Sequence, residues 1–164
     1  MKRIGYIVLV MFSFLLSGCG LSNEEEIKQL KDETITWPEE SKEPNEEANH
    51  YSFFLPFGMN VEEQVDNNIV IESGDTTYLL FYNENEEKTS QTLYEGVKSS
   101  SSEWDIDETN NEDGFHYVLI RKIDEEVEIT AGNGQVKISS IIKNDIKDHV
   151  EKMLSIIKSF KVNE

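Results

Sequence analysis

The segment VEITAGNGQVKISS, residues 127–140, carries the strongest fold signal of the chain. At its centre, Asn133-Gly134 is the preferred pair of a type I′ two-residue turn, so the sequence predicts a β-hairpin. Counted outward from that turn, the register pairs Gly132 with Gln135, Ala131 with Val136, Ile129 with Ile138, and Val127 with Ser140. The opposite face carries Glu128, Thr130, Lys137 and Ser139. We therefore expect one dry and one solvated face, and an element that covers the dry face.

A C-terminal helix is the expected cover. Between about Asn144 and Phe160, apolar residues recur at three- and four-residue spacing and form one stripe. The stripe consists of Ile146, Val150, Met153, Leu154, Ile157 and Phe160. Asn144 or Asp145 can start this helix, and Lys158 lies near its end, where positive charge suits the helix dipole.

Further strands and a second helix are predicted upstream. Alternating or β-branched and aromatic runs predict strands at residues 51–57, 68–72, 76–82, 103–108 and 115–123. The turn Ser73-Gly74-Asp75 joins two of them, and the run 76–82 is apolar on both faces, which favours the middle of a sheet. Residues 89–98 have helical spacing. The predicted class is α+β, with an antiparallel sheet of five to seven strands, a C-terminal helix and one mid-chain helix in a single domain, residues 50–164.

Residues 19–49 have a different composition. They hold ten acidic residues against three lysines, and this combination of high charge and low hydrophobicity predicts an acidic disordered tether. Such a tether spans on the order of 30 Å and would hold the domain clear of a membrane. Within it, Ser22 or Asn23 can cap a short helix that ends near Lys31. Two interpretations of Trp37 stay open: it docks on the domain or on a partner, or it is an isolated apolar residue.

The first residues are typical of a signal peptide. Lys2 and Arg3 precede an apolar run, Ile4 to Leu16, that no charge interrupts. This run of about 13 residues falls within the length of a signal-peptide core and is shorter than the roughly 20 residues of a membrane-spanning helix. We expect residues 1–18 to be a signal peptide.

The four residues Leu16-Ser17-Gly18-Cys19 resemble the lipobox of bacterial lipoproteins. The resemblance implies cleavage between Gly18 and Cys19, attachment of a diacylglycerol to the thiol of Cys19, and acylation with fatty acids such as palmitate. It places the protein on the extracytoplasmic face of the cell membrane, with the lipid bilayer as a partner. The alternative is an ordinary secretory signal with an accidental cysteine; no second cysteine is present to form an internal disulfide.

The charge balance argues against two kinds of partner. Removing residues 1–18 removes Lys2 and Arg3. The remaining chain then has 13 of the 15 basic residues and all 33 acidic residues, which gives a net charge of −20. Nucleic-acid binding needs a positive footprint, and adhesion to anionic lipid headgroups needs clustered basic residues. We expect no nucleic-acid partner, and attribute the acidity mainly to solubility.

No sequence motif points to catalysis. The chain lacks the G-x-S-x-G, H-E-x-x-H and G-x-x-x-x-G-K-[ST] patterns, and its three histidines, His50, His116 and His149, are far apart. We expect neither an enzyme nor a cofactor.

One acidic group is a weak candidate for metal binding. Asp105, Asp107, Glu108, Glu112 and Asp113 fall on a predicted strand and the turn after it. Carboxylates of this kind can bind calcium, but their spacing differs from that of an EF-hand loop. A solvated acidic hairpin is the favoured interpretation.

The order of elements resembles the PsbP-like fold, which also occurs in small bacterial lipoproteins. The resemblance extends over residues 51–162 and includes Pro56-Phe57-Gly58 after the first strand and the final segment Ser155 to Phe160. Proteins of that group mostly act as accessory or assembly factors without a catalytic centre. The resemblance implies the same for this chain.

Two functional hypotheses follow. The first is a tethered, non-catalytic interaction domain that serves a cell-envelope protein complex as an accessory factor. The second is a small-ligand or calcium-binding envelope lipoprotein, suggested by the acidic turn and by the aromatic residues Trp104, Tyr78 and Tyr82.

The lipobox generates a direct prediction. Replacing Cys19 by alanine (Cys19→Ala) removes the only thiol that can carry the lipid, so the protein should leave the membrane fraction in a fractionation experiment. A Cys19→Ala variant that stayed with the membranes would refute the lipoprotein interpretation.

Overall fold

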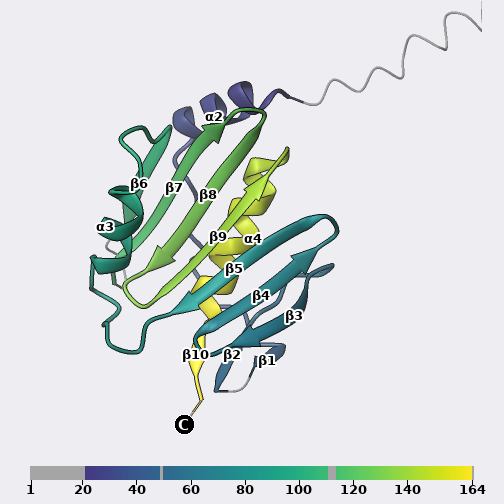
Figure 1. The fold of residues 1–164 in the computed structure, drawn as a ribbon, viewed down its shortest axis with the longest axis vertical. Coiled ribbons are helices and arrows are strands. Elements are labelled where there is room, and N and C mark those ends of the chain that lie inside the picture. Colours follow the sequence, from purple (N-terminus) through teal and green to yellow (C-terminus); the bar gives the residue numbers. More distant parts are fainter. Residues whose placement is uncertain (1–20, 49, 111–113, 164) are drawn as a thin grey trace, which may run out of the picture.

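A seven-stranded antiparallel sheet organises the molecule, which is described by a computed structural model over residues 21–48, 50–110 and 114–163 (Figure 1). Its strand order is β3-β4-β5-β9-β8-β7-β6. The strands are β3 (Asn60–Val65), β4 (Asn68–Ser73), β5 (Thr76–Tyr82), β6 (Ile106–Asn110), β7 (His116–Ile123), β8 (Glu126–Asn133) and β9 (Val136–Ile142). The predicted α+β class is confirmed, as is the interior position of β5 between β4 and β9.

A second, three-stranded sheet lies at one end of the long axis (Figure 1). It consists of β1 (Glu46–Ala48), β2 (Tyr51–Phe53) and β10 (Lys161–Val162), in the order β1-β2-β10. Three helices complete the described part of the fold: α2 (Asn23–Asp32), α3 (Thr92–Lys98) and α4 (Ile146–Ser159). Strands β1, β3 and β10 were not predicted, because they are very short or, in β3, rich in charged residues. None of the helices in the described ranges is long and apolar enough to cross a bilayer.

The predicted register of the β8–β9 hairpin is wrong by two residues. Gly132 pairs with Lys137 and Ala131 with Ile138, instead of with Gln135 and Val136. A type I′ turn needs positive φ at Asn133 and Gly134, and neither residue has it. Instead, the side-chain Oδ1 of Asn133 accepts hydrogen bonds from the amides of Gln135 and Val136, each at 2.8 Å, and closes a longer loop. Since a shift of two residues preserves the facing of every side chain, the predicted apolar face is retained.

Gly134 is needed for a close contact between segments far apart in sequence. A Cβ atom at this position would lie 2.1 Å from the carbonyl oxygen of Glu87 and 2.7 Å from the amide nitrogen of Ser90. The amide of Gly134 donates to the carbonyl of Lys88 at 3.3 Å. The hairpin tip therefore fits against the loop before α3 because residue 134 has no side chain.

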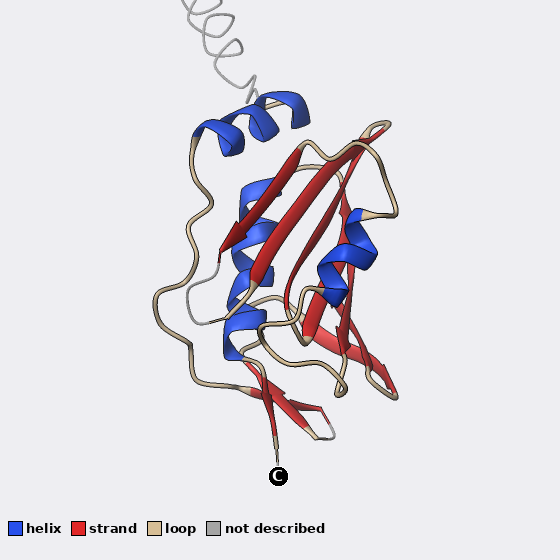
Figure 2. Cartoon of the chain, turned by 90° about the vertical axis from the view of Figure 1, so that its left-hand side faces the viewer, coloured by secondary structure: helices blue, strands red, loops and turns tan. Residues whose placement is uncertain are grey.

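Helix α4 covers the inner face of the sheet (Figure 2), and its apolar stripe packs against that face, as predicted. Ile146, Met153 and Ile156 are fully buried there, packed against a core that includes Ile129 and Ile138. Phe160 ends the helix and lies between the two sheets, with its ring centroid 5.5 Å from that of Tyr82 and 6.2 Å from that of Phe53. The final helix thus joins both sheets.

The opposite, outer face of the sheet is not uniformly solvated, contrary to the prediction. Helix α3 packs over β8 and encloses a second, smaller core of Tyr94, Phe115, Tyr117 and Leu119. Thr130, predicted to face water, is 1% exposed. Only the part of this face that is formed by β3, β4, β5 and β9 lies outside the cover of α3 (Figures 1 and 2).

The predicted disordered tether is also wrong for residues 21–48, which fold onto the domain. The short capped helix is confirmed as α2: Ser22 is its N-cap, and the Ser22 hydroxyl and the Glu25 carboxylate form a reciprocal capping box. Composition hid the docking, because the segment has few apolar residues with which to anchor itself, chiefly Ile27, Leu30 and Ile35. Each of them is 5% exposed and belongs to the main core.

The close contact at the hairpin tip generates a prediction. Gly134→Ala places a methyl group inside the 86–90 loop and should lower the free energy of unfolding by about 1–3 kcal/mol in a thermal or denaturant titration. Gly96→Ala is the matched control, because residue 96 lies in α3 with open space around its Cα. That control should be neutral or stabilising by up to about 1 kcal/mol. Equal stabilities for the two variants would contradict the packing described here.

Candidate functional site

The predicted acidic group does not form one site in the described residues. Asp105 precedes β6, while Asp107 and Glu108 are consecutive residues of that strand and therefore point to opposite faces of the sheet. Glu112 and Asp113 lie outside the described residues. Within residues 21–48, 50–110 and 114–163, no group of three or more His, Cys, Asp or Glu side chains could hold a metal ion.

Each described carboxylate of that group already has a protein partner. Asp105 accepts a hydrogen bond from the amide of Lys122 at 2.9 Å and lies 3.5 Å from the ammonium of Lys31. Glu108 accepts from the amide of Ile35 at 3.4 Å. These two carboxylates therefore help to hold the segment that contains α2 against the edge of the sheet.

Asp107 is part of a different cluster, under α3. Its carboxylate lies 2.8 Å from the ammonium of Lys98 and accepts a hydrogen bond from the hydroxyl of Tyr94 at 2.9 Å. The hydrogen bonds to Asp107 and Tyr94 raise the pKa of Lys98. This arrangement joins α3 to the outer face of β6.

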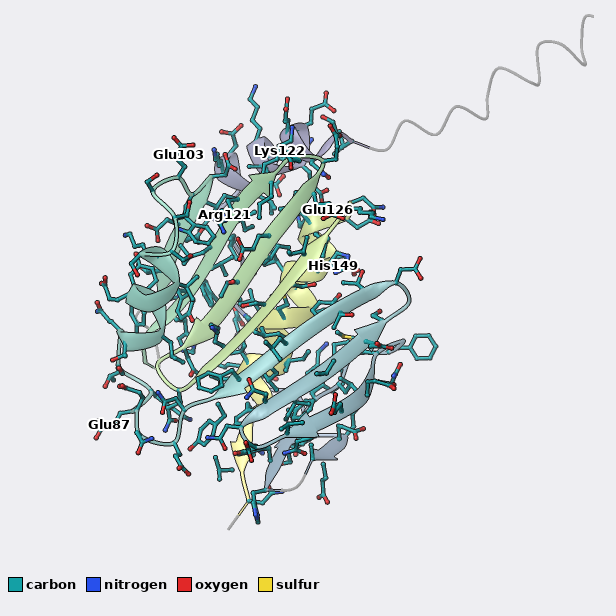
Figure 3. All side chains as sticks on the ribbon, viewed as in Figure 1. Glu87, Glu103, Arg121, Lys122, Glu126 and His149 are labelled. Atoms are coloured by element: carbon teal, nitrogen blue, oxygen red, sulfur yellow. The ribbon has the colours of Figure 1, made fainter. Side chains whose placement is uncertain are left out.

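The three histidines lie in three separate environments. His50 is exposed beside the small sheet, and His116 lies at the start of β7 with its ring 5.6 Å from that of Trp37. His149 on α4 (labelled in Figure 3) is partly buried, and its Nδ1 lies 2.5 Å from the hydroxyl of the buried Tyr78.

Burial favours the neutral forms of both members of the Tyr78–His149 pair. Burial, followed by the negative charge of Asp148, raises the pKa of Tyr78 to about 12, so its hydroxyl keeps its proton while it shares a hydrogen bond with Nδ1 of His149. Burial is also the main cause that lowers the pKa of His149 below 6.5, assisted by Lys152. Three acidic groups act in the opposite direction and are outweighed: Asp148, Asp145 and Glu26. Neutral His149 therefore contributes to the attachment of α4 to β5.

A cleft of about 250 Å³ lies between the segment that follows α2 and the C-terminal half of α4. Its apolar walls come from Trp37, Leu154 and Ile157, and its polar lining includes Glu39 and Lys158. Of the two interpretations of Trp37, docking on the domain is confirmed, because its side chain packs against the main core. The cleft is large enough for a small amphipathic group.

The aromatic residues that suggested ligand binding lie elsewhere. Tyr78 is fully buried beneath α4, and Tyr82 packs between Tyr51 and Phe160. Trp104 donates from Nε1 to the carbonyl of Lys98 at 3.2 Å and lies beneath the guanidinium of Arg121, 4.9 Å from its ring centroid. These side chains serve packing, and none of them lines the cleft beside Trp37.

An apolar strip crosses the uncovered part of the outer sheet face. We define it by Val65, Val70, Leu79, Phe81 and Ile141. Val70 and Leu79 are directly opposite each other on β4 and β5, and Ile141 lies diagonally from Leu79 on β9. Val65, Leu79 and Ile141 are 54%, 45% and 55% exposed, respectively.

Acidic groups flank this apolar strip. Glu63 lies opposite Val70 on the edge strand β3, and Glu72 lies two residues along β4 on the same face. Lys137 contributes a positive charge beside Phe81, with its ammonium 5.9 Å from the ring centroid. The sequence showed the alternation of side chains along β5. It did not show which part of the outer sheet face α3 would leave uncovered.

No family model, curated protein or solved structure matches this chain. The arrangement of its own residues offers two surfaces with binding character: the apolar strip and the cleft beside Trp37. The strip suits a flat protein surface, whereas the cleft suits a small molecule or a single side chain.

The Tyr78–His149 pair generates a pH prediction. Because the pKa of His149 is lower in the folded than in the unfolded state, the stability it contributes is complete above pH 6.5 and is lost as the pH falls below that value. His149→Gln, which cannot titrate, should flatten the decline of the unfolding free energy in this range. His50→Gln, at an exposed position, should retain the original slope; identical slopes for the unmodified protein and His149→Gln would contradict the assignment.

Proposed function

We propose that this chain is a membrane-anchored extracytoplasmic lipoprotein whose domain is a non-catalytic interaction module, an accessory factor in a cell-envelope protein complex. The anchoring part of the proposal is supported by the lipobox residues Leu16 to Cys19 and the leader before them. The interaction part is carried by one observation, the apolar strip on the outer sheet face.

The strip is unusual because the same sheet face is covered elsewhere. Over β7 and β8, the fold uses α3 to bury Tyr117 and Leu119, which are 0% exposed. No described element covers the outer face over β3, β4, β5 and β9, and Leu79 and Ile141 remain about half exposed. Adjacent exposed apolar side chains with a polar rim are typical of protein interaction sites.

Charge indicates what kind of partner fits. The chain carries a net charge of −18, and Glu63 and Glu72 flank the strip. Two copies of so acidic a chain repel each other, whereas a protein with an apolar patch rimmed by basic residues is attracted. We therefore propose a basic-rimmed protein surface as the occupant of the strip.

We also propose a relationship to the PsbP-like fold, as the element order of residues 51–162 suggests. Its members are mostly accessory factors, which agrees with the proposed role. Fold alone does not assign function, so the proposal rests on the strip and the lipobox.

A second candidate function is small-ligand binding in the cleft beside Trp37. The specific observation in its favour is that Trp37 and Ile157 form an apolar floor next to the charged side chains of Glu39 and Lys158. A ligand panel followed by Trp37 fluorescence in a Trp104→Phe background, with calcium included, distinguishes this function from protein binding.

Crosslinking in intact membranes tests the proposed partner. With a photoreactive amino acid at position 79 or 141 of the full-length chain, we expect a crosslink to a second, basic protein. Position 162 is the control, because Val162 is 50% exposed and apolar but lies in the small sheet. Leu79→Glu should reduce partner recovery severalfold while changing stability by about 0.5 kcal/mol or less. Crosslinks only between two copies, or equal crosslinking from position 162, would contradict the proposal.

A further inference from the structure

The proposed lipid attachment point lies next to a folded helix. Leu21 is the second residue after Cys19, and consecutive Cα atoms are 3.8 Å apart, so the Cα atoms of Cys19 and Leu21 are at most about 8 Å apart. Ser22, the next residue, is already the N-cap of α2. A flexible tether of about 30 residues between anchor and domain is therefore not available while α2 stays in place.

Apolar contacts hold α2 on the domain. Ile27 and Leu30 are each 5% exposed and belong to the same core as Val150 and Leu154 of α4. Ile35, also 5% exposed, continues this contact beyond the helix end. Losing these contacts would expose three large aliphatic side chains to water.

Polar contacts join α2 to two segments that are distant in sequence. The carboxylate of Glu24 lies 2.5 Å from the ammonium of Lys122, near the β7–β8 turn. The carboxylate of Glu26 accepts a hydrogen bond from the amide of Lys147 in the first turn of α4, at 2.9 Å. Since α2 bridges a strand end and a helix start, it is attached to the domain in one orientation.

The position of α2 in the fold determines which end of the domain lies nearest to the proposed lipid anchor. The helix lies at one end of the long axis, and the small sheet with the C-terminal strand β10 lies at the other (Figure 1). Lys122 marks the α2 end in Figure 3. The outer sheet face, which carries the apolar strip, runs along this axis (Figure 1).

We infer that the α2 end is a membrane-facing surface, an inference that rests on the proposed lipid anchor. The docked helix holds the domain against the lipid headgroups, with the small sheet farthest from the bilayer. Leu21 and Ile123, which are 53% and 37% exposed, lie at this end, and Leu21 lines a shallow hollow there together with Lys143. Asp124 and Glu125 oppose adhesion to anionic lipids, so the covalent anchor and the docked helix set the orientation.

This orientation also narrows the class of protein partner. A domain held upright at the bilayer turns the face that carries the apolar strip sideways, perpendicular to the membrane plane. Strands β3 and β4 lie in the half of the molecule that holds the small sheet (Figure 1), so the basic-rimmed partner must extend from the bilayer beyond the α2 end to reach the strip.

Energy transfer from the domain to the lipid surface tests the inference. The full-length, acylated protein is placed in phosphatidylethanolamine and phosphatidylglycerol vesicles with an acceptor on the headgroups. Because Cys19 is the only cysteine and is blocked by lipid, an introduced cysteine is the sole site for a donor dye. We expect severalfold stronger transfer from Glu125→Cys, in the β7–β8 turn, than from Lys161→Cys in β10.

A pair of helix variants identifies the cause of this difference. Leu30→Asp removes a buried contact of α2 and should bring the two transfer signals together, whereas Lys28→Asp, at an exposed position of the same helix, should preserve the difference. Equal transfer from both labels in the unmodified helix, with the protein still floating with the vesicles, overturns the inference. Failure to float with vesicles instead overturns the anchor of the proposed function.

Discussion

The structure depends on the burial of one helix stripe against one sheet face. The strands β5, β8 and β9 present Leu80, Ile129 and Ile138 to α4, and all three are 0–1% exposed. The other attachments are built on this contact. Tyr78 and His149 share a hydrogen bond across the same interface, Phe160 connects the helix to the small sheet, and α2 packs beside α4. Without α4, the small sheet and the N-terminal helix would each lose a large part of the surface on which they pack.

Local patterns were sufficient to predict the elements that make this contact. The periodicity of α4, the turn between β4 and β5, and the two-faced apolar character of β5 all follow from residue spacing. The register of β8 and β9 did not follow, because the Asn133 side chain replaces the expected turn with hydrogen bonds of its own. The sequence also did not show why a glycine is needed at position 134, since its close contact with Glu87 joins residues far apart in the chain.

The N-terminal segment shows how composition can mislead. Ten acidic residues between positions 19 and 49 obscure the signal of Ile27, Leu30 and Ile35, which are buried in the main core and help to dock α2 and the chain after it. Several of the acidic side chains form specific contacts, such as Glu24 with Lys122 and Glu33 with Lys147. Docking also changes what the proposed anchor would do. The segment that was expected to be a flexible spacer is part of the domain, so the anchor would restrict the orientation of the domain at the membrane.

The candidate interaction surface was only partly visible in the sequence. The outward residues of β5 could be identified by alternation, but their exposure depends on where α3 ends its cover of the sheet. The cleft beside Trp37 depends on the docking of a segment that composition assigned to solvent. In both cases the missing information is the placement of one element against another, which no local pattern contains.

Hydrogen exchange along α2 tests the central claim, that this helix is an integral part of the domain and leaves no flexible spacer between it and the proposed lipid anchor. The measurement is made on the acylated, full-length protein in vesicles, with α4 as the internal reference. We predict that the amides of residues 27–32 exchange as slowly as those within α4, because both helices share one core. Fast, unprotected exchange in α2 beside a protected α4 would contradict the account, since the domain would then be free to move on a flexible tether.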